Sequence, residues 1–299
     1  MQLLFSERNN NMKAIIFGAG GQDGHYLNDV LLRAGIKVVA VSRRTGYKHI
    51  DISNFQEVLD LVGNEKPGYI FHLAANSTTR HDAIFENHQT ISTGTLNIME
   101  AVRTKAPACR VFISGSGLQF KNTGNPISET DEFEARDPYS VSRIQSVYAS
   151  RYFRSFGLKI YVGYFFNHES PLRTERHMTR KISEAAKRIK AGSREQLTIG
   201  DISVVKEYTY AGDAVEAVWQ LVNQEKIFEA NIGSGTGYSI RDWLDACFGL
   251  VNIDWGPHVT ESDNFTPDYK SLVCDPTVIH SLGWKPQVSF DELAKMMMK

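Results

Sequence analysis

The chain has 299 residues, 42% of them hydrophobic, and its acidic and basic residues nearly balance at a formal net charge of −1. This length and composition allow a large buried core in one composite domain or in two domains in close contact. The charge is near neutral and spread along the chain, which argues against a surface that binds nucleic acid.

Cysteine usage and hydropathy indicate the compartment. Cys109, Cys247 and Cys274 form no CxxC pair, so the sequence encodes neither a disulfide framework nor a zinc cluster. The nine histidines form no HxxxH pair, and we expect no metal site. No apolar run has the length of a membrane span. We therefore expect a cytoplasmic protein that has no membrane partner.

Residues 1–11 lack the apolar core of a signal peptide. The first predicted strand follows directly after Met12, so we interpret residues 1–11 as an extension that precedes the folded chain.

In chain order, short β-rich runs alternate with segments of helical periodicity, beginning with the apolar run at 14–17. This alternation is typical of a parallel sheet that helices cover on both faces. Strands are predicted at 14–17, 38–41, 69–73, 111–114, 159–165 and near 230–232. Helices are predicted after Gly24 and at 55–62, 139–156, 177–190, 213–222 and 240–250, and 95–102 is predicted as the end of a long helix. We predict an α/β fold with a Rossmann doubly wound parallel sheet.

The rhythm changes after Asn167, where the elements become shorter and carry more glycine, aspartate and proline. We expect a Rossmann domain at 12–165 and a smaller C-terminal α/β lobe made mainly of 166–299, with some later segments returning to the Rossmann domain. No repeat or flexible linker separates the two parts, so we expect them to share one interface.

Three glycines follow the first predicted strand at GxxGxxG spacing: Gly18, Gly21 and Gly24. Such a turn leaves room for the backbone to approach a pyrophosphate, and the amides of the following helix favour its charge. Glycine turns between strand and helix also arise for packing alone. Because the strand, the helix and the early position all agree, the pattern favours a dinucleotide site.

The second predicted strand runs into Arg43 and Arg44 rather than into an aspartate or glutamate. An acidic residue at this position is typical of an NAD site, whereas two cations suit the 2′-phosphate of NADP. The sequence therefore predicts NADP, with NAD as the alternative. A solvated arginine pair without a ligand is the simpler interpretation.

Tyr139 and Arg143 are spaced i and i+4, so they lie on one face of the predicted helix. A nearby cation favours the phenolate form of a tyrosine, which suits acid–base chemistry. Arginine supplies charge, but it cannot pass on a proton as lysine can. Such a pair is usually only helix surface, and its place after the fourth strand is what favours a catalytic role.

These segments together resemble the extended short-chain dehydrogenase/reductase (NAD-dependent epimerase/dehydratase) family. The resemblance is greatest to the GDP-mannose 4,6-dehydratases and the GDP-4-keto-6-deoxymannose reductases, and it runs from Met12 to about Lys299. The motifs that carry it are GQDGHYL at 21–27, HLAANS at 72–77, GTLNIMEAVR at 94–103, DPYSVSR at 137–143, FNHESPLR at 166–173, TRKI at 179–182 and GWKP at 283–286.

The resemblance implies an NADP-binding Rossmann domain and a substrate-binding lobe for a nucleoside diphosphate sugar. The implied cofactor contacts are Gly18, Gly21, Gln22, Asp23, Gly24, Arg43, Arg44, Asp51, Ile52, Leu73, Ala74, Ala75, Tyr139, His168 and Arg173. Asn167 is at a position where the family contacts the sugar nucleotide. In such enzymes hydride leaves C4 of the hexose for the cofactor while the tyrosine accepts the hydroxyl proton. The 4,6-dehydratases then use a glutamate to eliminate water across C5 and C6.

The chain departs from this pattern at the residues that would do the chemistry. Arg143 stands where the family has a lysine, Gly117 stands in place of the eliminating glutamate, and Gly115 in place of a threonine. Glu169, on another loop, is the candidate to replace the missing glutamate. Ser114 and Ser116 remain as candidates to orient a C4 oxygen.

The nucleotide-binding segments depart from the family as well. Lys206-Glu207 replaces an Arg-Asp pair, so Lys206 becomes the candidate substrate contact, and Thr266-Pro267 replaces an arginine before proline.

Three functions remain open. The first is an NADP-dependent oxidoreductase of a nucleotide sugar, with a GDP-sugar favoured, that performs 4-keto reduction, oxidation or epimerisation through Tyr139, Arg143 and a serine of the 114–116 turn. The second is a 4,6-dehydratase with relocated catalytic groups. The third is a cofactor-binding pseudoenzyme. The resemblance also implies a homodimer or homotetramer, with Ala149, Tyr152 and Phe153 as apolar contact surface.

Overall fold

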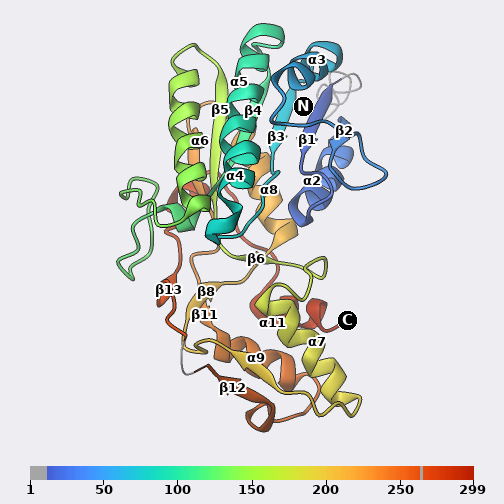
Figure 1. Cartoon of the computed structure of the whole chain (residues 1–299), viewed down its shortest axis with the longest axis vertical. Helices are drawn as coiled ribbons and strands as arrows, with labels where there is room; N and C mark the ends of the chain where they lie inside the picture. Colours follow the sequence, from blue (N-terminus) through green and yellow to red (C-terminus); the bar gives the residue numbers. More distant parts are fainter. Residues whose placement is uncertain (1–11, 263–264) are drawn as a thin grey trace.

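A six-stranded parallel sheet forms the upper part of the molecule in the computed structural model, which describes residues 12–262 and 265–299 (Figure 1). The strands lie in the order β10-β5-β4-β3-β1-β2, and every neighbouring pair is parallel. They are β1 (Lys13–Phe17), β2 (Lys37–Val41), β3 (Tyr69–His72), β4 (Arg110–Ser116), β5 (Lys159–Phe165) and β10 (Glu229–Ile232). All six coincide with strands that the sequence predicts.

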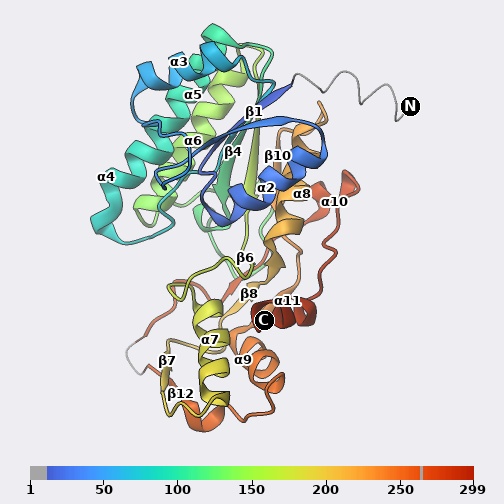
Figure 2. The ribbon, with the colours of Figure 1, turned by 90° about the vertical axis from the view of Figure 1, so that its right-hand side faces the viewer.

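Continuous apolar runs such as Ala14–Phe17 form these strands because helices bury both faces of the sheet. On one face lie α3 (Phe55–Glu65), α5 (Gly94–Lys105) and α6 (Pro138–Arg154). On the other lie α2 (Gln22–Arg33), α8 (Ala211–Val222) and α10 (Thr277–Ser281), as Figure 2 shows. The helix predictions at 55–62, 95–102, 139–156 and 213–222 are confirmed.

The strand order reverses direction between β1 and β3. From β1 the chain first adds β2 on one side and then returns to place β3 on the other. The connections that leave β1 and β3 therefore diverge at the carboxyl edge of the sheet. In open α/β sheets, ligands bind in the crevice at this reversal point.

The sequence predicts a long helix that ends at 95–102, but it does not predict how the start of that helix is wound. The short turns η1 (His81–Ala83) and α4 (Ile84–Asn87) lead into η2 (His88–Thr93), which is wound as a π-helix and continues into α5. A π-helical segment does not follow the 3.6-residue repeat on which the prediction depends, so the pattern shows only the regular end.

A smaller lobe lies below the sheet (Figure 1) and has its own core around Trp243 and Phe248. Its helices are α7 (Met178–Lys190), α9 (Ile240–Gly249) and α11 (Phe290–Met297). Its strands are β7 (Leu197–Ile199), β8 (Val205–Glu207), β11 (Gly237–Ser239), β12 (Val259–Glu261) and β13 (Ser271–Leu272). β6 (His168–Glu169) and β9 (Thr209–Tyr210) pair between the two parts, and η4 is Gly256–His258.

The helices α10 and α11 were not predicted, whereas α7 and α9 were. α8, β10 and α10 follow residue 166 in the chain and lie with the six-stranded sheet. The domain boundary near residue 165 stays a prediction, and the extension 1–11 lies outside the described residues. Among the described residues, no helix combines the length and the hydropathy that crossing a membrane requires.

A partly buried charge cluster fixes α6 against the edge of the sheet. Glu229 on β10 accepts two hydrogen bonds from Arg151, at 3.0 and 2.7 Å, and others from Arg154 and, at 2.6 Å, the Tyr164 hydroxyl. Burial alone would raise the pKa of Glu229, but these donors outweigh it and lower the pKa to about 2. The helix that carries Tyr139 is thus held at its far end by an ionised carboxylate.

Candidate active site and cofactor cleft

A cleft of about 320 Å³ opens where the carboxyl ends of the strands face the smaller lobe. Most of the residues that the sequence nominated line it. They are Gly21, Gln22, Asp23, Leu73, Ala75, Ser114, Ser116, Tyr139, Arg143, Asn167, His168 and Arg173. Residues from both ends of the chain thus meet at the edge that the strand order marks.

The other nominated residues do not line this cleft. They are Gly18, Gly24, Arg43, Arg44, Asp51, Ile52, Ala74 and Lys206. Lys206 lines a separate cavity of about 370 Å³ in the smaller lobe.

The glycine turn after β1 is packed too tightly for side chains. Gly18 has φ +93°, and a Cβ there would lie 2.6 Å from the backbone nitrogen of Ala74. A Cβ on Gly24 would lie 2.5 Å from the carbonyl oxygen of Gly18, so the first turn of α2 rests directly on the loop. The two glycines that do not line the cleft are therefore needed for the close approach of strand, loop and helix.

The first turn of α2 presents backbone amides to the cleft. Gly21 is the N-cap of α2, and no side chain there accepts a hydrogen bond from the helix amides. The loop before it is fastened to β2 by hydrogen bonds from the Gly18 and Ala19 amides to the Val41 carbonyl. A helix N-terminus without a side-chain cap can receive an anionic group.

The two arginines after β2 lie in different settings. Arg43 forms an exposed ion pair with Glu86 of α4 at 3.0 Å, and Glu86 also accepts a hydrogen bond from Asn76 at 2.7 Å. Arg44 crosses the glycine turn, since a Cβ on Gly20 would lie 2.9 Å from its Cδ.

Asp51 and Ile52, two of the implied cofactor contacts, already interact with other residues of the protein. The Asp51 carboxylate accepts hydrogen bonds from Ser53. Ile52 is buried, its carbonyl accepts from Asn97 at 2.9 Å, and its side chain packs on Gly94. The side chain of Ile52 is therefore part of the core.

Tyr139 and Arg143 lie in the first two turns of α6, whose start the sequence specifies. Asp137 caps the helix by accepting hydrogen bonds from the amides of Tyr139 and Ser140, at 2.8 and 2.9 Å, and Pro138 takes the first helical position. Tyr139 is 8% exposed and Arg143 is 4% exposed, and both line the cleft.

The guanidinium of Arg143 is 4.9 Å from the centroid of the Tyr139 ring, so it contacts the ring face. It donates hydrogen bonds to the carbonyl of Ser114 and, at 2.7 Å, to the hydroxyl of Ser114. Among the described residues, no carboxylate pairs with it. Burial, together with the charge of Arg143, lowers the pKa of His72 to about 3, so this histidine is neutral.

The two candidate serines have different tasks. The Ser114 hydroxyl donates to the His72 carbonyl at 2.9 Å and accepts from Arg143, so its proton is committed within the protein. The Ser116 hydroxyl accepts from the Leu118 amide at 3.2 Å in the short turn η3 (Gly117–Gln119), and its own proton remains available. Ser116 is therefore the serine that can hydrogen-bond a ligand oxygen as a donor.

Aromatic rings occupy the space beside the two glycines of this turn. A Cβ on Gly115 would lie 2.6 Å from Cδ1 of Tyr164, whose hydroxyl is tied to Glu229. A Cβ on Gly117 would lie 2.8 Å from Cε1 of Phe166, a buried ring. Any side chain at either position requires one of these rings to move.

Glu169, the substitute acid considered from the sequence, is turned away from the cleft. It is 6% exposed, accepts a hydrogen bond from Thr179 at 2.8 Å and pairs with Arg173 at 3.3 Å. It is not among the residues that line the cleft. The carboxylate that does line the cleft among the described residues is Asp23, and it is bound to His168.

Polar contacts clamp the start of α2 to the segment that leads into the smaller lobe. Gln22 accepts a hydrogen bond from Ser170 at 2.7 Å, and Asp23 contacts Nε2 of His168 at 2.9 Å. Arg173 donates to the His168 carbonyl at 2.9 Å. The helix that would receive a cofactor phosphate is thus joined directly to the connection between the two parts.

The hydrogen bonds of His168 define its charge. Nδ1 faces the Phe166 carbonyl at 2.8 Å and Nε2 faces the Asp23 carboxylate, and both partners only accept. Burial opposes ionisation of Asp23, but attraction to His168 outweighs it and holds the pKa of Asp23 well below its usual range. Burial likewise lowers the pKa of His168, and Asp23 more than restores it, so the net direction is upward. His168 is therefore an imidazolium that donates from both nitrogens.

Several residues of the cleft were missed by the sequence analysis. They are Ser77, Thr79, Leu118, Phe165, Phe166, His177, Tyr269 and Leu272. Ser77 and Phe166 lie within the quoted motifs HLAANS and FNHESPLR, which offered a signal. Tyr269 comes from a loop near the end of the chain and Leu272 from β13, and nothing in their local sequence indicates that they reach the cleft.

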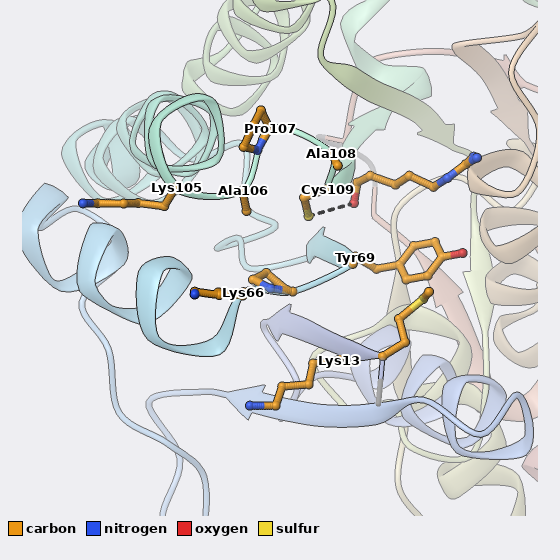
Figure 3. A pocket seen from close by; sticks show the side chains of 12 residues that line it. Lys13, Lys66, Tyr69, Lys105, Ala106, Pro107, Ala108 and Cys109 are labelled. Atoms are coloured by element: carbon orange, nitrogen blue, oxygen red, sulfur yellow. Dashed lines mark hydrogen bonds between the residues drawn. The ribbon is translucent and has the colours of Figure 1, made fainter. Parts of the chain in front are cut away.

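A larger cavity, about 590 Å³, opens at the opposite, amino-terminal edge of β1, β3 and β4. The side chains of Lys13, Lys66 and Lys105 lie on one side of it and Tyr69 lies on the other (Figure 3). It contains none of the nominated residues, so its size does not make it the candidate active site. Within the described part of the chain, no cluster of three or more potential ligands suits a metal ion.

Comparison with known proteins identifies the family. The family model described as GDP-mannose 4,6 dehydratase matches residues 15–297. GDP-mannose 4,6 dehydratase 1 of Arabidopsis thaliana is 33% identical over 329 residues, which cover 95% of this chain and 88% of that relative.

Solved structures share the fold at lower identity. RMD from Pseudomonas aeruginosa complexed with NADPH matches with a TM-score of 0.85 at 20% identity, over 96% of this chain and 97% of that chain. The UDP-glucose 4-epimerase of Thermus thermophilus complexed with NAD matches with a TM-score of 0.82 at 22% identity, over 96% of this chain and 98% of that chain. The predicted Rossmann doubly wound fold is confirmed.

The Asp23–His168 pair makes stability depend on pH. Because the pKa of His168 is raised in the folded state, its contribution is complete below about pH 6.5 and is lost as pH rises through the folded pKa. We expect the free energy of unfolding in urea to fall across this range, and we expect Asp23→Asn to remove that slope. The exposed His81→Gln variant is the control and should keep it. A slope unchanged in Asp23→Asn would contradict the assignment.

Proposed function

The chain belongs to the GDP-mannose 4,6-dehydratase family of enzymes, and on this basis we propose that it is an NADP-dependent oxidoreductase of a nucleoside diphosphate hexose. The proposed reaction transfers hydride at C4 of the sugar, in 4-keto reduction, oxidation or epimerisation, and omits the elimination of water. One observation carries the proposal. Tyr139, Arg143 and Ser116 meet in one cleft, whereas glycine and aromatic rings fill the place of an eliminating acid.

The glycine cradle supports a nicotinamide dinucleotide as the cofactor. Side chains at Gly18 and Gly24 would overlap the neighbouring backbone, and the amides at the start of α2 have no side-chain cap. Gly21, Gln22 and Asp23 would hold the pyrophosphate, and Leu73 to Ala75 would lie along the nicotinamide side. The bound cofactor supplies or accepts the hydride.

Tyr139 is the proposed acid and base at the C4 oxygen. In the oxidative direction its phenolate accepts the hydroxyl proton as hydride leaves C4, and in the reductive direction its hydroxyl returns that proton. Ser116 donates a hydrogen bond that orients the same oxygen. Arg143 supplies a fixed positive charge beside the ring, and its role is electrostatic because a guanidinium keeps its proton. Ser114 acts as the positioning residue for Arg143.

The second cavity supports binding of a diphosphate. Lys206 lines it with Arg176 and Lys181; the Lys206 ammonium forms no ion pair or hydrogen bond with the described residues, and the Lys181 ammonium donates to the Thr198 carbonyl at 3.1 Å. Asp201 and Asp268 line the same cavity. Burial lowers the pKa of Lys206, and the charge of Glu169 opposes this shift. A cation in such a setting is stabilised by an anionic ligand. Asn167 lines the cleft between Tyr139 and this lobe, and family membership favours a GDP-sugar.

The elimination reaction of the family has no agent in this cleft. Gly117 carries no acid, Glu169 is held by Thr179 and Arg173, and Asp23 is paired with His168. A dehydratase with relocated groups therefore has no candidate base among the described cleft residues.

We expect Tyr139→Phe to lower turnover by at least about a hundredfold, because the variant loses the proton donor and acceptor but keeps the ring under Arg143. The measurement is the change in NADPH absorbance with candidate 4-keto sugar nucleotides. Tyr148→Phe, on the exposed face of the same helix, is the control and should keep full activity. NADPH affinity should be equal in all three proteins. Full turnover in Tyr139→Phe would exclude the proposed role.

The proposed preference for NADP depends on Arg43, which the structure pairs with Glu86. Arg43 is the nominated 2′-phosphate ligand, and it is held by a carboxylate that competes for it. We expect Arg43→Ala to weaken NADPH binding about tenfold with NADH unchanged, and Glu86→Gln to tighten NADPH binding by up to about fivefold. Fluorescence titration measures both, and Arg80→Ala, which breaks the exposed pair with Asp82, is the control. Equal losses for NADPH and NADH would contradict the assignment.

We also propose that the chain forms a homodimer, or a homotetramer built from it, through α5 and α6. These two helices lie side by side (Figure 1), and large apolar side chains are exposed on them, namely Leu96, Tyr148 and Tyr152, with Phe156 just after the end of α6. Phe153, which the sequence analysis had placed on this surface, is instead 7% exposed and belongs to the core.

We also propose a cytoplasmic location. The three cysteines are unpaired and buried, which is typical of proteins in a reducing compartment.

A charge on this surface should disrupt the assembly. We expect Tyr152→Glu to convert the protein to monomers in sedimentation velocity, because a carboxylate would be buried without a partner in the contact. Leu250→Glu, on the smaller lobe, changes an equally apolar exposed side chain and should leave the assembly intact. An unchanged sedimentation coefficient in Tyr152→Glu would place the interface elsewhere.

A further inference from the structure

Three cavities meet at Tyr269. One is the cleft that contains Tyr139, the second is the cavity around Lys206, and the third is a side cavity of about 320 Å³ next to Gly117. Tyr269 lines all three. Among the described residues that line these cavities, it is the one shared by the cleft and the Lys206 cavity.

Both parts of the molecule fix the ring of Tyr269. It packs against the core on the α6 face of the sheet and also against the core of the smaller lobe. The position of the ring therefore depends on the way the two parts are joined. A side chain that is held from both sides loses little further freedom when it binds a ligand.

The hydroxyl of Tyr269 is not engaged by the protein. It forms no hydrogen bond with the described residues. Burial, with a smaller effect from Asp268, raises the pKa of Tyr269 to about 12, so the phenol keeps its proton at neutral pH. The cavity junction thus contains a positioned hydrogen-bond donor that no described residue engages, so it can donate to a ligand placed there.

The groups on the two sides of this junction differ in chemistry. On the Lys206 side, Arg176, Lys181 and Lys206 suit an anion. On the cleft side, Tyr139 and Ser116 suit the hydroxyl or keto oxygen of a sugar. A molecule that occupies both sides has its anionic part adjacent to its sugar, and the point of attachment lies beside Tyr269.

We propose that the Tyr269 hydroxyl donates a hydrogen bond to the sugar-linked phosphate of a nucleoside diphosphate sugar. This inference depends on the proposed function and adds to it a residue that selects for a diphosphate. A nucleoside monophosphate has no group at this position, so Tyr269 discriminates between the two classes. The nucleotide half alone, as GDP or UDP, carries the phosphate that the contact requires.

Tyr269→Phe tests the contact because it removes the hydroxyl and keeps the ring that packs against both cores. Calorimetric titration with GDP, GMP, UDP and UMP is carried out on the wild type and the variant. A hydrogen bond to a charged phosphate predicts that the variant binds the diphosphates at least about tenfold more weakly and the monophosphates unchanged. Tyr69→Phe, which removes a buried hydroxyl bound to Asn223 far from the cleft, is the control and should leave all four affinities unchanged.

An equal loss for diphosphates and monophosphates would overturn the inference, because it would mean that Tyr269 only shapes the cavity. Unchanged diphosphate affinity would overturn it as well. If the wild type binds NADPH but none of the four nucleotides, the proposed substrate class fails and the inference fails with it. If the diphosphate preference depends on Tyr269 while Tyr139→Phe keeps full turnover, the contact stands and the proposed catalytic mechanism fails.

Discussion

The contact between Arg143 and Ser114 is the constraint on which the rest of the site depends. A guanidinium that is 4% exposed and has no carboxylate partner among the described residues must find its stabilisation in neutral groups. The carbonyl and hydroxyl of Ser114 and the face of the Tyr139 ring supply it. Three consequences follow. The charge of Arg143 adds to burial in keeping His72 neutral, the Ser114 oxygen accepts from Arg143 while its proton goes to the His72 carbonyl, and Ser116 becomes the serine left to meet a ligand. The substitution of arginine for lysine thus redistributes the tasks of the whole turn.

The same turn explains why the chain departs from its dehydratase relatives. Loss of the eliminating glutamate is a change of packing as well as of chemistry, because Phe166 has closed over Gly117 and Tyr164 over Gly115. Tyr164 is in turn held by Glu229, which also anchors the far end of α6. The helix that carries Tyr139 and the ring that fills the turn therefore share one partly buried charge cluster. A site arranged in this way can move a hydride and a proton at one carbon, and it offers no group to remove a proton from the next.

Local patterns in the sequence predicted much of this. The six strands are buried on both faces and read as apolar runs, the glycine turn has a spacing that only close packing explains, and Asp137-Pro138 specifies the start of α6. What escaped prediction depends on contacts distant in the chain. The π-helix η2 breaks the regular repeat, the Arg43–Glu86 pair joins residues 43 positions apart, and Tyr269 reaches the cleft from a late loop. Glu169 was a plausible acid by its position, and only its partners Thr179 and Arg173 show that it is occupied.

The most direct test of the central claim follows the hydrogen at C5 and the oxygen at C6 of the sugar. The purified protein, loaded with the oxidised or reduced cofactor, is incubated in deuterated water with GDP-mannose and with 4-keto sugar nucleotides, and the products are examined by mass spectrometry and NMR. The account predicts oxidation, reduction or inversion at C4, with the C6 oxygen retained and no deuterium at C5. A 6-deoxy-4-keto product that carries deuterium at C5 would contradict it. Forming that product requires a base beside C5, and the Phe166 ring leaves no room for one at position 117.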